Sequence, residues 1–166
     1  MGQGLRFEEA FPDLFRLAYQ VSFRVLGDRG DAEDVAQEAL ARAHVRWARL
    51  RERPQGWVVT VSTHLAIDRL RRRQRARLGD EEPMALVELH LTERIDLARA
   101  LRRLARRQRQ VVVLRYLADW SEADVARALG CSTGSVKSHA ARGLAHLRRS
   151  LDERGSRGGD DVRASG

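Results

Sequence analysis

The chain has 166 residues, 43% of them hydrophobic and only 5% aromatic, and it carries a formal net charge of +8. This length fits one ordinary domain or two small ones, and the positive charge predicts a polyanionic partner, nucleic acid before membrane, although an arginine-rich coding bias gives the same charge. One cysteine and scattered histidines exclude a disulfide framework and a clustered metal site, and we expect no cofactor. The sequence has no apolar signal core and no run of about 18 apolar residues, which predicts a cytoplasmic protein without membrane insertion.

The N-terminal half has the apolar spacing of three helices. Apolar residues recur at helical intervals from Phe7, and Gly27 follows them as a left-handed C-terminal cap. Asp31 is expected to cap a second helix that runs to about Trp47, and Pro54 fits the first turn of a third helix. No strand-like alternation occurs, so the sequence predicts helices only.

Opposite charges are concentrated on the second and third helices. An acidic face opens the second helix at Asp31, Asp34, Gln37 and Glu38. Acidic residues near a helix N-terminus offset the helix dipole, and they would equally form a docking face for a basic protein surface, separate from any DNA-binding surface. The third helix ends in an arginine track, which is either a solvated face or, as we favour, a contact for phosphates. The track consists of Arg69, Arg71, Arg72, Arg73, Arg75 and Arg77.

The middle of the chain changes composition. It becomes acidic, and Pro83 argues against a continuous helix, so we interpret it as a linker with at most one helical turn near residues 85–91. Helical spacing resumes at Leu97, while the last residues are rich in Gly, Ser, Asp and Arg and are expected to be disordered. The predicted architecture is all-α. It has one small helical domain at residues 5–78, an acidic linker at 79–96, a second small helical domain at 97–152 and a disordered tail at 153–166.

A helix-turn-helix pattern lies near the C-terminus. One amphipathic helix follows Ser121, Gly130 provides the turn, and Ser132 is expected to cap a second helix. The outer face of this second helix carries small and polar side chains, with Arg142 as its one long side chain. Such a face fits a DNA major groove, so it favours DNA binding over an ordinary helical hairpin of a bundle. The residues expected at DNA are Ser132, Thr133, Ser135, Lys137, Ser138 and Arg142.

Catalytic patterns are absent from the sequence. We find no P-loop, no dinucleotide-binding glycines, no nucleophile elbow and no zinc-protease motif, so we do not expect an enzyme. Cys131 at the helix-turn-helix corner is expected to pack rather than react. Trp47 and Trp57 are also expected to pack, with Trp57 the better candidate for stacking on a base.

Both halves resemble bacterial extracytoplasmic-function (ECF) sigma factors. The second conserved region of that family resembles residues 7–9, 26–28, 31–39 and 65–72. The fourth region resembles residues 107–111, 114–116, 121–122, 129–130 and 135–138. The resemblance extends over nearly everything except the tail, and it includes the acidic linker.

This resemblance implies an alternative sigma factor that binds core RNA polymerase, directs it to promoters and helps to open DNA, with no chemistry of its own. The acidic face would dock on the largest polymerase subunit, and the C-terminal domain would dock on the other large subunit and read the −35 element. The −10 element would contact Arg51, Arg53, Trp57, His64, Asp68, Arg71 and Arg72. An anti-sigma factor is a further partner that the resemblance implies.

The chain departs from the family pattern at two positions. His64 stands where the family often has the Asn that contacts the flipped base, and Thr63 replaces a common Arg. A −10 preference is therefore not carried over from the family. Two other functions remain as alternatives: a helix-turn-helix repressor or activator that acts outside the polymerase, and a non-specific nucleic-acid-binding protein. The acidic face followed by the arginine track disfavours the first, and the small recognition face disfavours the second.

Overall fold

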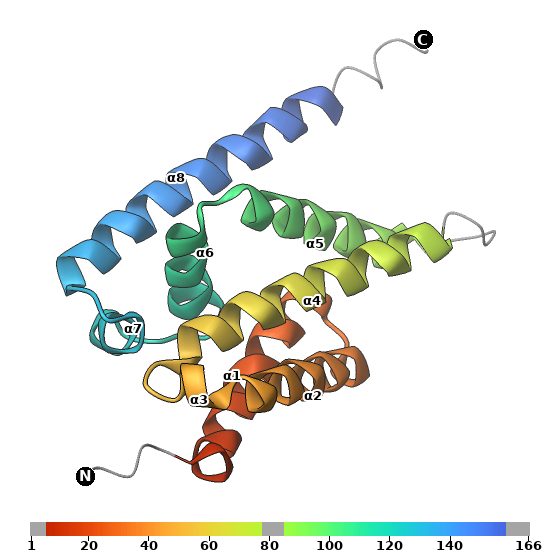
Figure 1. The fold of residues 1–166 in the computed structure, drawn as a ribbon. Helices are drawn as coiled ribbons and strands as arrows, with labels where there is room; N and C mark the ends of the chain where they lie inside the picture. The colour runs from red at the N-terminus through yellow and green to blue at the C-terminus, as the bar shows by residue number, and fades with distance from the viewer. Residues whose placement is uncertain (1–5, 78–84, 159–166) are drawn as a thin grey trace, which may run out of the picture.

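The computed structural model describes residues 6–77 and 85–158, and all regular structure in these ranges is helical (Figure 1). The prediction of an all-α fold is confirmed. The elements in chain order are α1 (Phe7–Leu26), α2 (Arg29–Val45), α3 (Trp47–Leu50), α4 (Pro54–Arg77), α5 (Ala85–Arg103), α6 (Arg106–Val112), the π-helix η1 (Val113–Leu117), α7 (Glu122–Leu129) and α8 (Thr133–Gly158).

The N-terminal half is a bundle of α1, α2 and α4 around aliphatic side chains such as Val21, Leu40 and Ile67. Gly27 ends α1 in the left-handed conformation, with φ of 68°, as its position predicted. The N-terminal cap of α2 is Asp28 and not Asp31, because the Asp28 carboxylate accepts the Asp31 backbone N–H at 2.9 Å. That hydrogen bond lowers the pKa of Asp28.

Two helix boundaries near the loop between α2 and α4 were predicted with different success. Pro54 is the first residue of α4, as expected. The helix α2 ends at Val45 rather than near Trp47, and Trp47 instead begins the four-residue helix α3. The Trp47 ring meets the Phe7 ring edge-on, with centroids 5.2 Å apart, so Trp47 packs against α1 as predicted.

The linker and the tail are more helical than the sequence predicted. The helix α5 begins two residues after Pro83 and continues unbroken to Arg103, so the expectation of at most one turn over residues 85–96 was wrong. Ile95, Ala98 and Leu101 recur on one face and are buried, and this tertiary contact stabilises the helix. The helix α8 runs to Gly158, which corrects the expected disorder over residues 153–158. Residues 79–84 and 159–166 lie outside the described residues.

In the C-terminal half, α6 is surrounded by other helices. It stands between α8 and α4 (Figure 1), and the four consecutive residues from Val111 to Leu114 are at most 1% exposed. Four residues cover most of a helix circumference, so a run buried in this way needs partners on all sides. The π-helix η1 then widens the turn, with the Ala118 N–H donating to the Val113 carbonyl at 3.0 Å.

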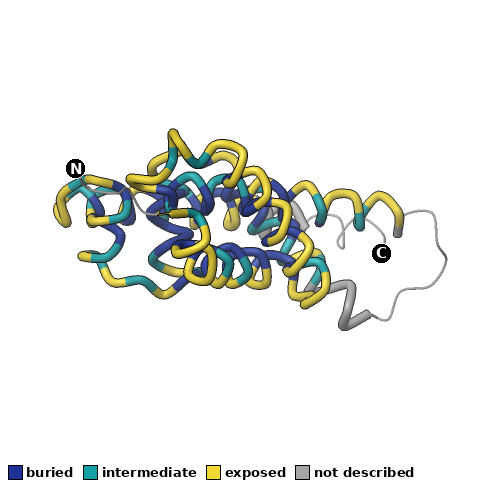
Figure 2. Tube along the Cα trace, turned by 60° about the horizontal axis from the view of Figure 1, so that its bottom comes forward, coloured by how far each residue is buried: buried dark blue, intermediate teal, exposed yellow. Residues whose placement is uncertain are grey.

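The two halves share one core in the described part of the chain. A single cluster of buried apolar residues contains Leu14 and Leu40 from the first half together with Leu101 and Val125 from the second. Figure 2 shows the buried segments gathered in the interior, with exposed residues around them. The acidic segment therefore does not keep the two helical domains apart in this structure.

Candidate nucleic-acid interface

The helix-turn-helix has the local geometry that its sequence predicts. Ser121 caps α7 by accepting the Asp124 N–H at 3.1 Å, and Gly130 closes α7 with φ of 63°. Ser132 then caps α8 by accepting the Ser135 N–H at 3.1 Å. Two serine caps and one left-handed glycine thus fix the angle between α7 and α8, because each satisfies backbone groups that the helix ends leave free.

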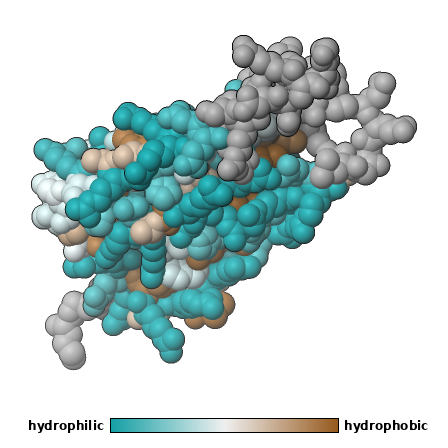
Figure 3. Space-filling model, turned by 90° about the horizontal axis from the view of Figure 1, so that it is seen from above, coloured by the Kyte–Doolittle hydropathy of each residue, from teal (hydrophilic) through white to brown (hydrophobic). Residues whose placement is uncertain are grey.

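The outer face of α8 is open. Gly134, Ala141 and Arg142 are exposed, whereas Ser138 is only half-exposed. Seen from the side of α8, hydrophilic residues dominate the surface and apolar ones form small scattered patches (Figure 3). A small, polar helix face with one long cationic side chain can enter a major groove without a steric obstacle.

The inner face of α8 packs against the rest of the C-terminal half. The buried residues follow alternating steps of four and three and are Val136, Ala140, Gly143, Leu147 and Ser150. Leu151 is 39% exposed, although it is apolar, because this spacing places Ser150 inward instead. Gly143 was missed by the sequence argument: an added Cβ would lie 2.6 Å from a methyl carbon of Val112, so α6 approaches the α8 backbone directly.

Other residues assigned to the −35 element have partners within the chain. The Ser132 hydroxyl is occupied as the cap and lies 3.0 Å from the Ser135 hydroxyl. Lys137 is exposed and pairs with Glu122 of α7 at 3.7 Å. Thr133 is exposed at the start of α8. Cys131 packs partly buried against the core, as predicted.

The acidic face and the arginine track are not separate surfaces, which corrects the sequence interpretation. Arg69 pairs with Asp31 at 2.6 Å and with Asp34 at 2.8 Å, and Arg73 also pairs with Asp31. The hydrogen bond that Arg69 donates to the Asp31 carboxylate, together with the one it donates to Asp34, raises the pKa of Arg69. The Asp31 side chain is only 12% exposed, so it joins α2 to α4 and is largely withdrawn from the surface.

The ion pairs between α2 and α4 leave fewer residues of the acidic face and of the arginine track available to a partner. Asp34, Gln37 and Glu38 remain exposed on α2, and Glu38 makes a one-turn ion pair with Arg42 at 2.5 Å. On α4, the exposed members of the arginine track among the residues with described side chains are Arg71, Arg72 and Arg75. The exposed acids and the exposed arginines are therefore the parts of each surface that a partner can reach.

The residues assigned to the −10 element lie in the loop between α3 and α4 and along α4. Trp57 is half-buried, with the Arg46 guanidinium carbon 5.9 Å above its ring, and Arg51 is exposed. Burial, together with nearby Arg109 and Arg102, lowers the pKa of His64, which favours the neutral imidazole.

Thr63 is an interior residue of α4. It is fully buried, and its hydroxyl donates to the Val59 carbonyl at 2.7 Å. The position at which the family often has Arg is therefore part of the core in this chain, and it offers nothing to DNA.

The structure also brings the −10 residues against the C-terminal half, which the sequence did not predict. Asp68 pairs with Arg102 of α5 at 3.2 Å. The guanidinium of Arg53 lies against Gly130, at the turn before α8. Two residues assigned to the −10 element, Arg53 and Asp68, thus contact the C-terminal half.

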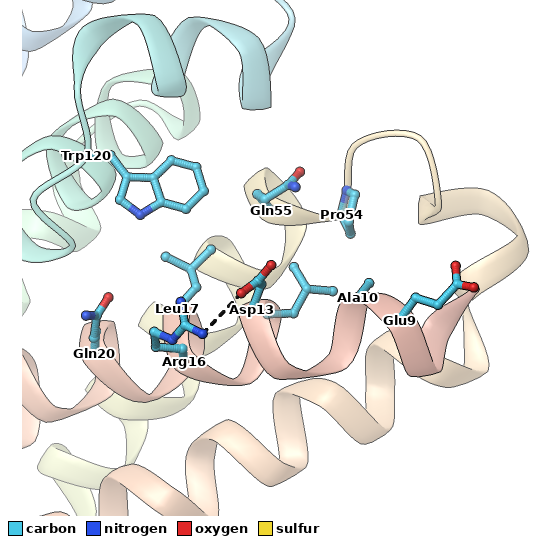
Figure 4. Close-up of a pocket in the computed structure, with 10 residues that line it drawn as sticks. Glu9, Ala10, Asp13, Arg16, Leu17, Gln20, Pro54, Gln55 and Trp120 are labelled. Carbon is cyan, nitrogen blue, oxygen red and sulfur yellow. Dashed lines mark ion pairs between the residues drawn. The ribbon is translucent and has the colours of Figure 1, made fainter. Parts of the chain in front are cut away.

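A cavity of about 310 Å³ opens where the two halves meet. Trp120 projects across it toward α1, opposite Pro54 and Gln55 (Figure 4). Its charged lining residues include the pair of Asp13 and Arg16, 3.2 Å apart. Among the described residues, no three His, Cys, Asp or Glu side chains are grouped to hold a metal, and none of the described helices is long and apolar enough to cross a membrane.

Comparison with known proteins finds two matched regions in the chain. The family model of Sigma-70 region 2 matches residues 7–76, and that of Sigma-70, region 4 matches residues 94–147. A solved structure of the sigma factor RpoE in complex with the anti-sigma factor NepR from Bartonella quintana aligns with a TM-score of 0.45 at 20% identity, over 88% of this chain and 96% of that one.

Curated relatives cover most of the chain. The RNA polymerase sigma-E factor of Streptomyces coelicolor is 33% identical, over 91% of this chain and 89% of the relative. The ECF RNA polymerase sigma factor SigM of Mycobacterium tuberculosis is 36% identical, over 86% of this chain and 77% of the relative. With both sigma regions matched in order and identity of this extent, the chain belongs to the ECF family of RNA polymerase sigma factors, which direct the polymerase to promoters.

Proposed function

We propose that this chain joins core RNA polymerase through the exposed part of α2 and reads promoter DNA through α4 and α8, in the cytoplasm and without chemistry of its own. The observation that carries this proposal is the pairing of an open, capped recognition helix with an exposed acidic surface on a separate helix. A helix-turn-helix repressor needs only the first of these. An anti-sigma factor stays a prediction of the family resemblance.

Run-off transcription tests the proposal directly. Purified chain and core polymerase are combined on genomic promoter fragments, and transcripts that require the chain are identified. We expect new start sites that neither component gives alone. A protein that binds the same fragments but only blocks transcription by another holoenzyme would be a repressor, and the proposed function would be wrong.

The residue assignments follow from exposure and charge. We propose that Asp34, Gln37 and Glu38 bind polymerase. Asp31 supports this face, because its ion pair with Arg69 joins α2 to α4. Arg142 is proposed to read a base of the −35 element, and Thr133 and Lys137 to contact phosphates. Around the −10 element, Arg51, Trp57 and His64 are proposed to meet the melted strand. A pocket for an extruded base must offset an unstacking cost of a few kcal/mol.

The exposed arginines of α4 are expected to bind the DNA backbone rather than base edges. Replacing Arg71 and Arg72 with Ala should weaken holoenzyme–promoter complexes by a similar factor at all sequences. It should also reduce the slope of log affinity against log salt by roughly 0.7–0.9 per lost phosphate contact. Arg73 is left in place because it pairs with Asp31.

The measurement is a salt titration of promoter binding. Replacing Arg6, which precedes α1, and Arg16 of α1 with Ala is the control, because both arginines are exposed and, among the described residues, pair only with near neighbours in the sequence, Glu8 and Asp13. The control should leave the slope unchanged. A loss at only some sequences, with the wild-type salt slope, would show that Arg71 and Arg72 read bases.

A further inference from the structure

A second group of arginines lies where α5 ends and α6 begins, apart from the arginine track of α4. Six arginines occur within positions 99–109, and the proposed function uses none of them. Only Arg99 and Arg102 pair with carboxylates of the described residues, namely Asp96 and Asp68. The other four, which have no such partner in the described part of the chain, are Arg103, Arg106, Arg107 and Arg109.

Two contacts place the middle of α4 beside this group. Thr60, His64 and Asp68 are spaced by four residues and therefore share one face of α4. Gln110 of α6 donates to the Thr60 hydroxyl at 3.0 Å, one turn before His64. Arg102 of α5 pairs with Asp68 at 3.2 Å, one turn after His64. His64 thus lies between the points at which α6 and α5 reach the same side of α4 (Figure 1).

The charges around His64 are almost all positive. Burial, followed by the charges of Arg109 and Arg102, lowers the pKa of His64. Burial, followed by the charges of Arg102 and Arg106, lowers the pKa of Arg109. Asp68 acts on His64 in the opposite direction, but its carboxylate already pairs with Arg102. We call this group the cationic corner, and it consists of His64, Arg102, Arg106 and Arg109.

Arg109 is the member of the cationic corner that most needs an anion. Its side chain is half-buried, and its Nε is buried without a hydrogen-bond partner in the described part of the chain. A guanidinium that is partly withdrawn from water among like charges costs free energy unless a counter-ion neutralises it. An anion that contacts the accessible end of Arg109 would recover part of this cost, and the exposed side chains of Arg102 and Arg106 would add to its binding.

The burial of Arg109 favours a small anion over a nucleic-acid backbone. A duplex carries its phosphates on a convex surface, so it is bound by cations that stand clear of the protein, as Arg71 and Arg72 do. A small anion can reach a half-buried guanidinium that a duplex cannot approach. Guanidinium groups bind phosphate oxygens through paired hydrogen bonds, so several guanidinium groups match a ligand with several phosphates.

We propose that the cationic corner binds a small anion that carries several phosphate groups, either an inorganic polyphosphate or the phosphate chain of a nucleotide. The site is additional to the proposed contacts with polymerase and DNA, and it shares only His64 with the residues proposed to meet the melted strand. It can therefore be tested on the free chain, whatever the outcome for the proposed function.

The test uses two variants of the cationic corner, Arg109→Gln and Arg106→Gln, each of which removes one positive charge and keeps part of the aliphatic stem. Arg106 is exposed, so its variant stays informative if the half-buried Arg109 proves necessary for folding. Arg103→Gln is the matched control, because Arg103 is an exposed arginine that follows Arg102 directly and so points about 100° away from it around α5. Circular dichroism confirms that each variant is folded.

Affinity is measured by calorimetric titration of the full chain with inorganic triphosphate and, separately, with GTP, at constant ionic strength. We expect one-to-one binding in the wild type, a loss of about tenfold or more in Arg109→Gln and Arg106→Gln, and a change below about twofold in Arg103→Gln. If GTP binds no more tightly than triphosphate, the site recognises the phosphate chain alone, whereas tighter binding of GTP identifies a nucleotide as the ligand. No binding by the wild type, or an equal loss in all three variants, would overturn the proposal. So would a random-sequence DNA duplex whose binding falls as much in Arg109→Gln as that of triphosphate, because the corner would then bind the DNA backbone.

The position of the anion is read from the imidazole of His64. A bound anion beside His64 favours the protonated ring, so saturating triphosphate should raise the pKa of His64 from its lowered value in the free chain. The pKa is followed by proton NMR of the ring hydrogens, and the His64→Gln variant assigns the signal among the five histidines. The same rise is expected in Arg103→Gln. An unchanged pKa of His64 in saturating triphosphate would show that the anion binds elsewhere, and the proposal would be wrong.

Discussion

Reversing the exposed charges of α2, with Asp34→Lys and Glu38→Lys together, is expected to weaken the binding of core polymerase by about 2–5 kcal/mol. The two carboxylates lie one turn apart, are 59% and 52% exposed, and flank Gln37. A reversed charge that is buried in the interface and faces a charge of the same sign on the polymerase weakens binding by this amount. A reversed charge at the rim of the interface mainly changes the association rate. Association is measured by titrating labelled chain with core enzyme, without DNA.

The control for this prediction is Asp13→Lys on α1. Asp13 is 81% exposed and pairs within one turn with Arg16, so the change in net charge per residue and the kind of partner match those of Glu38 with Arg42. Asp34 also pairs with Arg69, so circular dichroism must show that the double reversal is folded, and Asp31 is left intact because it is only 12% exposed and holds both Arg69 and Arg73. Wild-type affinity in the double reversal, or an equal loss in Asp13→Lys, would remove α2 from the polymerase interface.

Replacing Arg142 with Ala is expected to cost about 1–3 kcal/mol on the preferred promoter and to relax discrimination at one or two adjacent base pairs of the −35 element. Arg142 is exposed on the open face of α8, where a guanidinium can contact two acceptors on a guanine edge. Polymerase binding should survive, because the buried residues of α8 are untouched.

The measurement is a holoenzyme binding series over all single substitutions of the −35 element, for wild type and Arg142→Ala. Arg148→Ala serves as the control, since Arg148 is also exposed on α8 but lies on a different side of the helix. A loss by the same factor at every sequence would assign Arg142 to a phosphate, and the base-reading role would be wrong.

Helix boundaries that depend on local chemistry were the predictable part of this fold. Gly27, Pro54 and Gly130 start or end helices as expected, and Ser132 caps α8. Each of these effects acts within about one turn of the chain, through a fixed φ, a missing N–H or a short polar side chain, so it can be read from neighbouring residues. The open face of α8 followed in the same way from helical periodicity.

The contacts that define the surfaces were decided by the tertiary structure. A run of arginines looks the same in sequence whether phosphates or carboxylates neutralise it, and only the packing of α2 against α4 assigns Arg69 and Arg73 to Asp31. Likewise, the contact of Gln110 with Gly56 joins residues 54 positions apart and has no characteristic spacing. The sequence by itself determined the family, the all-helical fold and the caps at Gly27, Gly130 and Ser132, because these depend on local or ordered patterns, but it did not determine the start of α5 or the Asp28 cap of α2. Which charges stay free and how the two halves meet depend on long-range packing.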